Sequence, residues 1–229
     1  SAFNRIPAML NFTAGSRNLK AAMKAGQISR IVTAHKFVEL GGLEDLIEEL
    51  SDSAEILYLE DVRENLTLSN KLIAALGSVL PGLVRKQSRY KSPGVMLFTS
   101  GTEGEPKGVV LSHENVMANV EQVRAHIGLS PDTDRLFNPL PTFHCFGLTV
   151  GAVLPIVAGI PVMFHPSPLQ PREIVRRIRA NQSTILLATD TFISQYARIG
   201  GDGDMSSVRL AVCGAERVKD ETRALVRRK

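Results

Sequence analysis

Short apolar runs rich in β-branched residues alternate along the chain with stretches in which apolar residues recur every three or four positions. The short runs predict strands over Ile31–Ala34, Ile56–Leu59, Val95–Thr99, Thr184–Ala188 and Val208–Cys213. Strands that alternate with helices form mostly parallel sheets with both faces covered. The pattern therefore predicts an α/β fold, a doubly wound and mostly parallel sheet with helices on both faces, whose ligands bind at the carboxyl ends of the strands.

Three helical stripes lie between these strands. The first comprises Val116, Val120, Val123 and Ile127, and Ser112 is placed to cap its amino end. The others are Leu43, Leu46, Ile47 and Leu50, and the group Ile174, Val175 and Ile178 behind Pro171 at a first helical turn. Each stripe leaves a polar face for solvent, as helices that cover a sheet do.

A long uncharged run, positions 145–164, matches the length of about 20 residues that a bilayer span needs. However, Pro155 and Pro161 would interrupt a single helix twice. We therefore predict a buried helix that ends at Leu154, a turn at Ala158–Gly159 and a short strand over Pro161–Phe164, rather than a transmembrane segment.

The sequence contains no internal repeat, and we expect residues 1–229 to form part of one domain. Its best candidate for an exposed connection is Gly77–Pro93, which is rich in Pro, Gly and basic residues. The chain opens on a predicted strand, Met9–Thr13, and stops inside a helical pattern at Arg227–Lys229. We therefore expect it to be the amino-terminal portion of a longer enzyme.

Composition narrows the class of protein. The 229 residues are 44% hydrophobic and 22% charged, as in an ordinary globular protein. The net charge of +4 is small, and the densest basic stretch, Arg172–Arg179, fits the solvated side of a helix, so we predict no nucleic-acid partner. Cys145 and Cys213 lie far apart and outside any CxxC pattern, which predicts a reducing, cytoplasmic setting for this domain.

The most informative segment is Phe98–Gly108, with the sequence FTSGTEGEPKG, which follows one apolar strand and precedes a second apolar run. Its glycines allow a tight bend that points several backbone N–H groups at one place. Thr99, Ser100 and Thr102 add hydroxyl donors and Lys107 adds a cation, so the segment predicts a polyphosphate cradle. A flexible hairpin is the alternative. A Walker loop is disfavoured, because Pro106 and Gly108 replace residues that it requires.

This segment resembles the phosphate-binding signature of the adenylate-forming superfamily, which includes acyl-CoA synthetases, luciferases and peptide-synthetase adenylation domains. Pro139–Gly147 resembles the second signature of the family, and Val212–Glu216 resembles the segment that lies against the adenine. Glu103 is a departure, since the common family form has Thr at this position. The motifs at Gly147–Gly151 and Pro166–Leu169 are most similar to the synthetase half of bacterial bifunctional enzymes that join an acyl-acyl carrier protein synthetase to a 2-acylglycerophosphoethanolamine acyltransferase.

The resemblance implies a role for each matching residue. The residues that would hold the ATP phosphates are Thr99, Ser100, Gly101, Thr102, Glu103, Gly104 and Lys107, and Thr102 would also contact the metal. Those beside the adenine would be Gly214, Ala215 and Glu216, and those at the acyl pocket would be Phe143, Phe146 and Gly147. His144 would be the catalytic residue, placed between the acyl carboxylate and the α-phosphate.

The reaction implied is activation of a fatty acid with ATP and Mg²⁺ through acyl-AMP, followed by transfer to a pantetheine thiol. The resemblance favours acyl carrier protein over coenzyme A as the acceptor, a role in phospholipid acyl turnover, and a longer protein at the bacterial inner membrane. The C-terminal lid subdomain and its catalytic Lys are absent from the sequence, and no His has Asp five residues on, as the acyltransferase half requires. We expect the chain alone to be inactive. Two alternatives stay open: a long-chain acyl-CoA synthetase, and a nucleotide- or acyl-binding module without catalysis.

Overall fold

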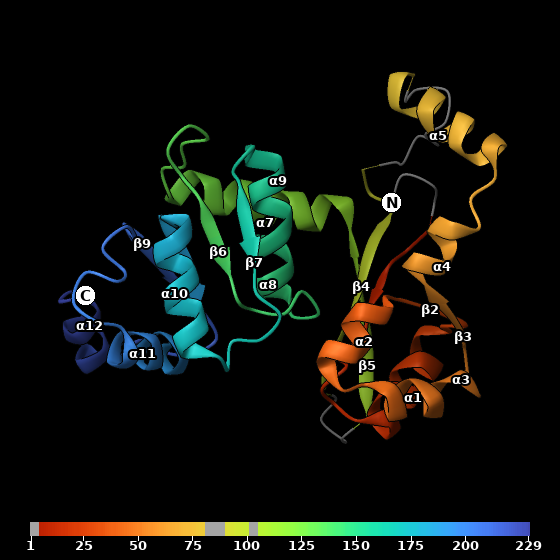
Figure 1. The fold of residues 1–229 in the computed structure, drawn as a ribbon, viewed down its shortest axis with the longest axis horizontal. Coiled ribbons are helices and arrows are strands. Elements are labelled where there is room, and N and C mark those ends of the chain that lie inside the picture. The colour runs from red at the N-terminus through yellow and green to blue at the C-terminus, as the bar shows by residue number, and fades with distance from the viewer. Residues whose placement is uncertain (1–4, 81–89, 101–104) are drawn as a thin grey trace. The chain divides into compact units, whose positions relative to one another are not determined.

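The computed structural model describes residues 5–80, 90–100 and 105–229. The chain divides into two compact units, Ser1–Glu114 and Asn115–Lys229, which are described separately below and can be followed by colour in Figure 1. Within the described ranges, no helix combines the length and the apolar character that crossing a bilayer requires.

Unit 1 contains two small sheets. Strand β4 (Pro93–Ser100) pairs in parallel with β1 (Ala8–Met9) and antiparallel with β5 (Pro106–Ser112), while β2 (Arg30–Thr33) and β3 (Glu55–Tyr58) form a separate parallel pair. The helices of this unit are α1 (Ser16–Gly26), α2 (His35–Gly41), α3 (Glu44–Ser51), α4 (Leu59–Glu64) and α5 (Leu68–Val79). Leu19 and Met23 of α1 pack with Leu50 of α3 in a small apolar core. The predicted strands Ile31–Ala34, Ile56–Leu59 and Val95–Thr99 and the helix around Leu46 are confirmed.

The predicted strand Met9–Thr13 is wrong for most of its length. The side-chain Oδ1 of Asn11 accepts hydrogen bonds from the backbone N–H of Thr13 at 3.0 Å and from its hydroxyl at 2.7 Å. These local bonds hold the backbone in a turn, so that the strand ends at Met9. Of the predicted connection Gly77–Pro93, residues 77–79 belong to α5, residues 81–89 lie outside the described residues, and Tyr90 is exposed.

Unit 2 is built on a four-stranded parallel sheet in the order β7–β6–β8–β9. Its strands are β6 (Leu136–Asn138), β7 (Val162–Phe164), β8 (Ile185–Ala188) and β9 (Leu210–Cys213). Its helices are α7 (His113–His126), whose first two residues fall in unit 1, α8 (Cys145–Leu148), the π-helical turn η1 (Thr149–Val153), α9 (Leu154–Ala158), α10 (Pro171–Asn181), α11 (Asp190–Ile199) and α12 (Asp220–Val226).

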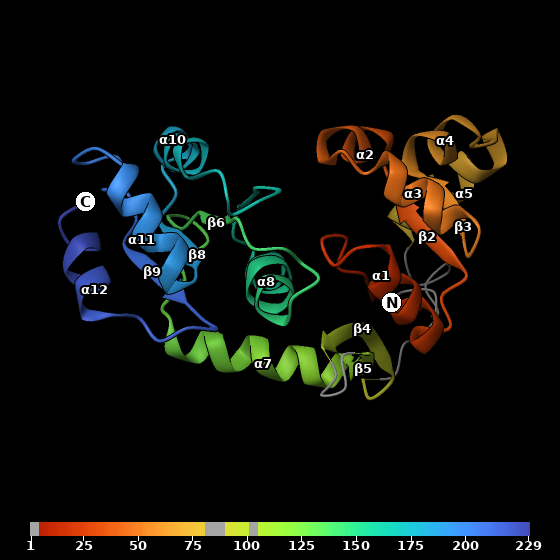
Figure 2. The same cartoon turned by 90° about the horizontal axis from the view of Figure 1, so that it is seen from below.

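Both faces of this sheet are covered, as the sequence predicts. Ile185 and Leu187 of β8 point into a core shared with α7, η1 and α9, whereas Leu186 and Ala188 point into a second core shared with α10 and α11. Figure 2 shows the elements that carry these two cores around the sheet. A strand buried on both faces needs an unbroken apolar sequence, and that is what 185–188 provides. The doubly wound, mostly parallel fold is thus confirmed.

The predicted end of a helix at Leu154 is wrong. The helix that begins at Cys145 passes through η1 and continues past Pro155 to Ala158, where Gly159 ends it with a φ of 69°. Proline lacks an N–H and its ring crowds the carbonyl four residues earlier. The wider π-helical turn directly before Pro155 makes room for the ring, so the helix survives the proline.

A polar network ties the amino ends of three strands together. Asp134, which is only 1% exposed, accepts hydrogen bonds from Arg209 at 2.7 and 2.6 Å, from the Thr184 hydroxyl at 2.8 Å and from the Ser130 N–H at 2.8 Å. These residues precede β6, β8 and β9. The Arg209 side chain, assisted by the Ser130 N–H and the Thr184 hydroxyl, holds the pKa of Asp134 well below its usual range.

We expect Asp134→Asn to lower the free energy of unfolding at pH 7 by about 2–3 kcal/mol, because it leaves Arg209 without its charged partner. A carboxylate whose pKa is depressed by folding stabilises the protein above its unfolded pKa, near 4, and loses that effect as the pH falls further. Urea unfolding of both proteins at pH 7 and at pH 3 checks this. The difference should shrink at pH 3, and an undiminished difference would contradict the role of the charge.

Candidate active site

The topology of unit 2 singles out the carboxyl ends of β6 and β8. The chain leaves β6 toward β7 on one side of the sheet, and it leaves β8 toward β9 on the other. Loops that leave neighbouring parallel strands in opposite directions open a crevice between them, which is where doubly wound sheets bind ligands. His144 lies in the segment after β6, and Asp190 follows β8.

The loop after β6 is held by the buried side chain of Asn138, the last residue of that strand. Its Oδ1 accepts a hydrogen bond from the Leu140 N–H at 3.0 Å, and its Nδ2 donates to the Gly147 carbonyl at 3.3 Å. A Cβ on Gly147 would collide with the carbonyl of Pro141, and a Cβ on Gly151 would collide with the Asn138 amide. The two glycines therefore let the helix pack directly against the loop that carries His144.

His144 is exposed and immediately precedes the first residue of α8. Its backbone N–H donates to the Pro141 carbonyl at 3.2 Å, which fixes the turn. The neighbouring Phe143 ring is buried, and its centroid lies 4.6 Å from that of the imidazole. The loop thus turns an aromatic ring inward and presents the imidazole at the surface, near the carboxyl end of the sheet.

The segment after β9 reaches the same region. A Cβ added to Gly214 would lie 3.2 Å from the ring of Phe146, so the predicted adenine-side and acyl-side residues are in contact at this point. Ala215 has a φ of 66°, a left-handed conformation that is uncommon for a residue with a Cβ. Such conformations cost free energy and are found most often at functional sites, where the surrounding structure holds them.

The carboxylate of Glu216 is held by hydrogen bonds to Thr191. Its Oε2 accepts hydrogen bonds from the N–H of Thr191 at 3.0 Å and from the Thr191 hydroxyl at 2.8 Å, so the carboxylate lies at the amino end of α11. A negative charge is favourable there because the first N–H groups of a helix have no partner inside it. Glu216 therefore links the turn after β9 to the helix after β8.

Asp190, the buried residue that begins α11, is not among the residues that the sequence analysis singled out. Its Oδ1 accepts a hydrogen bond from the Lys219 N–H at 2.9 Å, and this bond, with one from the Thr222 hydroxyl, lowers the pKa of the Asp190 carboxyl. Asn138 was missed as well. The signal for both was available, since each is a polar residue at the end of a predicted or implied strand, where ligands of such sheets bind.

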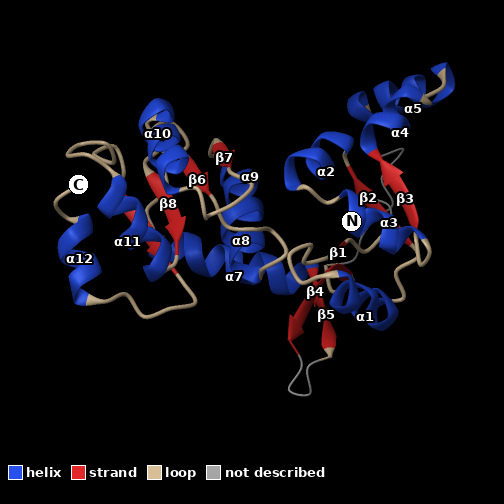
Figure 3. Cartoon of the chain, turned by 60° about the horizontal axis from the view of Figure 1, so that its bottom comes forward, coloured by secondary structure: helices blue, strands red, loops and turns tan. Residues whose placement is uncertain are grey.

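Residues 98–100 and 106–108 of the predicted phosphate-binding segment belong to the antiparallel strands β4 and β5 of unit 1, shown in Figure 3. Thr99 is paired with Lys107 across the two strands, so the two side chains leave the same face of the hairpin, and both are exposed. The backbone of Ser100 pairs with Pro106 one step closer to the tip. Gly101, Thr102, Glu103 and Gly104 lie outside the described residues, and their roles stay predictions.

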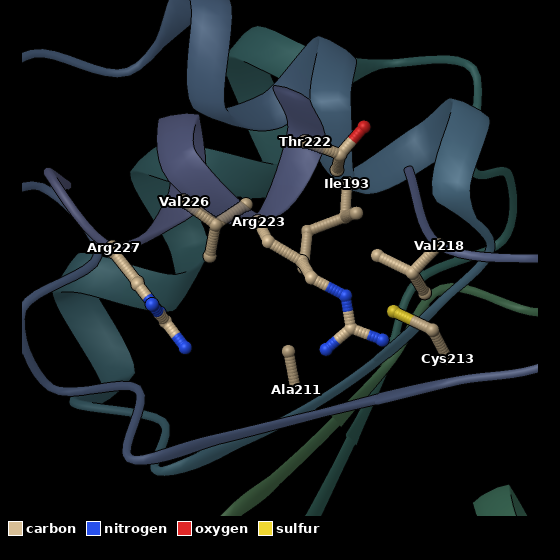
Figure 4. Close-up of a pocket in the computed structure, with 8 residues that line it drawn as sticks. All are labelled: Ile193, Ala211, Cys213, Val218, Thr222, Arg223, Val226 and Arg227. Carbon is tan, nitrogen blue, oxygen red and sulfur yellow. The ribbon is translucent and has the colours of Figure 1, made fainter. Parts of the chain in front are cut away.

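A cavity of about 360 Å³ borders β9 on the side of α11 and α12. It is lined by Ile193, Ala211, Cys213, Val218, Thr222, Arg223, Val226 and Arg227, which Figure 4 shows. Burial, with the nearby Asp190 carboxylate, raises the pKa of the Cys213 thiol, so this sulfur stays protonated. None of the predicted site residues that the structure describes lines the cavity.

In the described parts of the chain, no group of three or more His, Cys, Asp or Glu side chains is arranged to hold a metal ion. The predicted metal contact, Thr102, lies outside the described residues. Binding of Mg²⁺ therefore stays a prediction from the resemblance.

Known proteins match this chain in sequence and in fold. It is 29% identical over 155 residues to the long-chain-fatty-acid–AMP ligase FadD28 of Mycobacterium tuberculosis, covering 62% of this chain and 27% of the relative. It is 33% identical over 115 residues to the mitochondrial medium-chain acyl-CoA ligase ACSF2 of Danio rerio, covering 50% of this chain and 18% of the relative. The structure of o-succinylbenzoate CoA synthetase (MenE) from Bacillus subtilis in complex with AMP has a TM-score of 0.77 at 16% identity, covering 97% of this chain and 41% of that one.

The chain therefore spans less than half the length of each of these three proteins. The model of the protein family described as "AMP-binding enzyme" matches residues 2–229, almost the entire sequence. The hairpin, the loop after β6 and the turn after β9 all lie inside that match, and we conclude that the chain belongs to the AMP-binding enzyme family of the acyl-CoA synthetase superfamily.

Proposed function

We propose that this chain forms the amino-terminal part of a ligase that activates a fatty acid with ATP. A carboxylate oxygen attacks the α-phosphorus of ATP, which forms acyl-AMP and releases pyrophosphate. The sulfur of a pantetheine thiol then attacks the acyl carbon, a thioester forms, and AMP leaves. The proposal rests mainly on the β4–β5 pair of this chain, which belongs to the AMP-binding enzyme family. Thr99 pairs with Lys107 on the two strands that flank the glycine-rich segment.

The first step joins two anions, so the protein must neutralise charge and hold both reactants in line. Lys107 supplies a cation that binds the β- and γ-phosphates and then the leaving pyrophosphate. The hydroxyl of Thr99, on the same face of the hairpin, donates a hydrogen bond to a phosphate oxygen. Ser100, Gly101, Thr102 and Gly104 complete the cradle in this proposal, with Glu103 directed toward the metal or away from the phosphates.

The segments of unit 2 would bind the other two parts of the reactants. His144 donates a hydrogen bond where the acyl carboxylate meets the α-phosphate, which its exposed position after β6 allows. Phe146 and Gly147 border the acyl chain, while Phe143 supports the loop from its buried side. Gly214 and Ala215 approach the adenine, and Glu216 fixes their turn through Thr191.

ATP is a substrate in this proposal, and Mg²⁺ neutralises phosphate charge when it is bound. The structure of MenE has been determined in complex with ATP and a magnesium ion, which supports the same two ligands for this chain. We propose that the remaining groups needed for catalysis come from residues outside this chain, and that the 229 residues alone do not catalyse acyl activation.

Two acceptors of the acyl group are compatible with this proposal: acyl carrier protein and coenzyme A. The sequence motifs favour acyl carrier protein and a role in phospholipid acyl turnover, whereas ACSF2, a relative, is named as an acyl-CoA ligase. The test is to supply the longer protein with ATP, a fatty acid and equal amounts of acyl carrier protein and coenzyme A. Preferential acylation of the carrier protein supports the first acceptor, and preferential formation of acyl-CoA makes the protein an acyl-CoA synthetase.

We expect His144→Ala to slow adenylation by about 10²- to 10³-fold, since one donor to developing charge is lost. Thioester formation from preformed acyl-AMP should change far less, because the carboxylate has already reacted. Separate assays of pyrophosphate release and of thioester formation from acyl-AMP distinguish the two steps. An equal loss in both assays would show that His144 is not specific to adenylation.

A further inference from the structure

The cavity beside β9 is a candidate ligand site that acyl activation does not use. Its walls come from unit 2 alone, namely from β9, α11, α12 and the segment that joins β9 to α12. Its volume of about 360 Å³ falls near the lower end of the range of about 300–1,000 Å³ that is typical of small-molecule sites. A ligand of this cavity must therefore be small.

The walls of the cavity are mostly apolar. Four aliphatic side chains line it: Ile193, Ala211, Val218 and Val226. The Thr222 hydroxyl, which also borders it, already donates a hydrogen bond to the Asp190 carboxylate. Burial and Asp190 raise the pKa of the Cys213 thiol, although Arg223 acts in the opposite direction, so this wall carries no charge. Walls of this kind favour an apolar ligand body.

Two guanidinium groups border the same apolar space. Arg223 of α12 and Arg227, directly after that helix, lie four positions apart and hence on one side of it. Figure 4 shows both side chains pointing into the space that Ala211 borders. Among the described residues, no acidic side chain forms an ion pair with either of them. Like charges at this spacing repel each other, and an anion shared by both would relieve that repulsion.

The position of Arg227 bears on the kind of anion. A guanidinium group matches the paired oxygens of a carboxylate or of a phosphate. Helix ends favour phosphate where their backbone N–H groups are free, which is at the amino end. Arg227 lies at the carboxyl end of α12, where unpaired carbonyls carry partial negative charge and disfavour a dianion. The cavity therefore favours a singly charged carboxylate over a phosphate.

We propose that this cavity binds a small carboxylate with an apolar body. The carboxylate pairs with Arg223 and Arg227, and the body lies against the aliphatic side chains of β9, α11 and α12. The proposal goes beyond acyl activation and rests on no part of the adenylation site.

The test is a titration of the isotope-labelled 229-residue chain with cyclohexanecarboxylate, followed through its backbone amide NMR resonances. Cyclohexanecarboxamide keeps the shape of this probe without its charge, and cyclohexyl phosphate changes only the anionic group. Arg223→Gln and Arg227→Gln each remove one cation from the cavity. The matched control, Arg228→Gln, removes a neighbouring cation that does not line it. All three positions are exposed, so the variants should match the wild type in circular dichroism and in unfolding midpoint.

We expect the carboxylate to shift the amide resonances of Ala211, Cys213 and Val226, and to bind more tightly than the carboxamide or the phosphate. Arg223→Gln and Arg227→Gln should each weaken binding by at least about tenfold, because a charge-assisted hydrogen bond is lost. Arg228→Gln should stay within about twofold of wild type.

Three results would overturn the proposal. The first is a titration in which the cavity resonances do not move, including one in which only the loop around His144 responds, since the probe would then bind elsewhere. The second is binding of the carboxamide or the phosphate that equals or exceeds that of the carboxylate. The third is an equal loss of affinity in Arg228→Gln and in the two cavity variants.

Discussion

Replacing Lys107 by alanine in the longer enzyme should slow adenylation by roughly 30- to 900-fold, a loss of about 2–4 kcal/mol of transition-state stabilisation. Lys107 is exposed on β5 and pairs with Thr99 beside the tip of the hairpin. Negative charge on the leaving pyrophosphate grows as the bond to the α-phosphorus breaks, so a cation at this point stabilises the transition state more than bound ATP. Pyrophosphate exchange under saturating ATP measures the effect.

Lys91 provides the matched control for this substitution. It lies just before β4, at the end of the hairpin away from the tip, and is also exposed. Lys91→Ala removes the same side chain and charge but should leave the exchange rate within about twofold of wild type, since surface charges at this distance are screened. Equal exchange rates for Lys107→Ala and Lys91→Ala would show that Lys107 does not bind the phosphates.

Gly151→Ala should lower the free energy of unfolding by about 3–5 kcal/mol. The added methyl group would collide with the buried Asn138 amide, whose hydrogen bonds to Leu140 and Gly147 hold the loop after β6. Overpacking and the loss of buried hydrogen bonds both contribute to a cost of this size. Urea unfolding monitored by circular dichroism gives the free energy directly.

The control for Gly151→Ala is Gly128→Ala, where no atom lies within 4 Å of the added Cβ. This variant should unfold within about 0.5 kcal/mol of wild type. If the two variants were equally stable, the close approach of the helix to Asn138 would not contribute to stability. The same assay separates a folding defect from the loss of activity expected at His144, which lies in the loop that Asn138 holds.

Periodicity was sufficient to predict the framework of the fold. Ile185–Ala188 forms a central strand because four consecutive apolar residues suit a sheet buried on both faces, and α10 begins at Pro171 because proline fits a first helical turn. These features depend on residues close together in sequence, so a single chain reveals them.

The errors arose where one local preference met a competing interaction. Pro155 predicts the end of a helix, but the π-helical turn before it relieves the clash. Met9–Thr13 looks apolar enough for a strand, but the Asn11 side chain bonds to Thr13 and turns the chain. Neither outcome follows from hydropathy, since each depends on backbone geometry that the pattern does not contain.

The candidate site was predictable in its segments and not in its contacts. The motifs located the loop with His144 and the turn at Gly214, and the structure brings Phe146 and Gly214 together. The bonds from Thr191 to Glu216 join positions 25 residues apart, and the bond from Lys219 to Asp190 joins positions 29 apart. Such contacts follow from the order of β8 and β9 in the sheet, which the sequence alone leaves open.

The exchange of radiolabelled pyrophosphate into ATP by the longer protein, without any thiol acceptor, tests acyl adenylation by itself. Exchange reports reversible adenylation alone, because acyl-AMP and pyrophosphate re-form ATP. We expect exchange that requires a fatty acid and falls to background when the acid is omitted. The absence of exchange with every fatty acid tested, from a folded protein that binds ATP, would contradict the assignment of this chain to acyl adenylation.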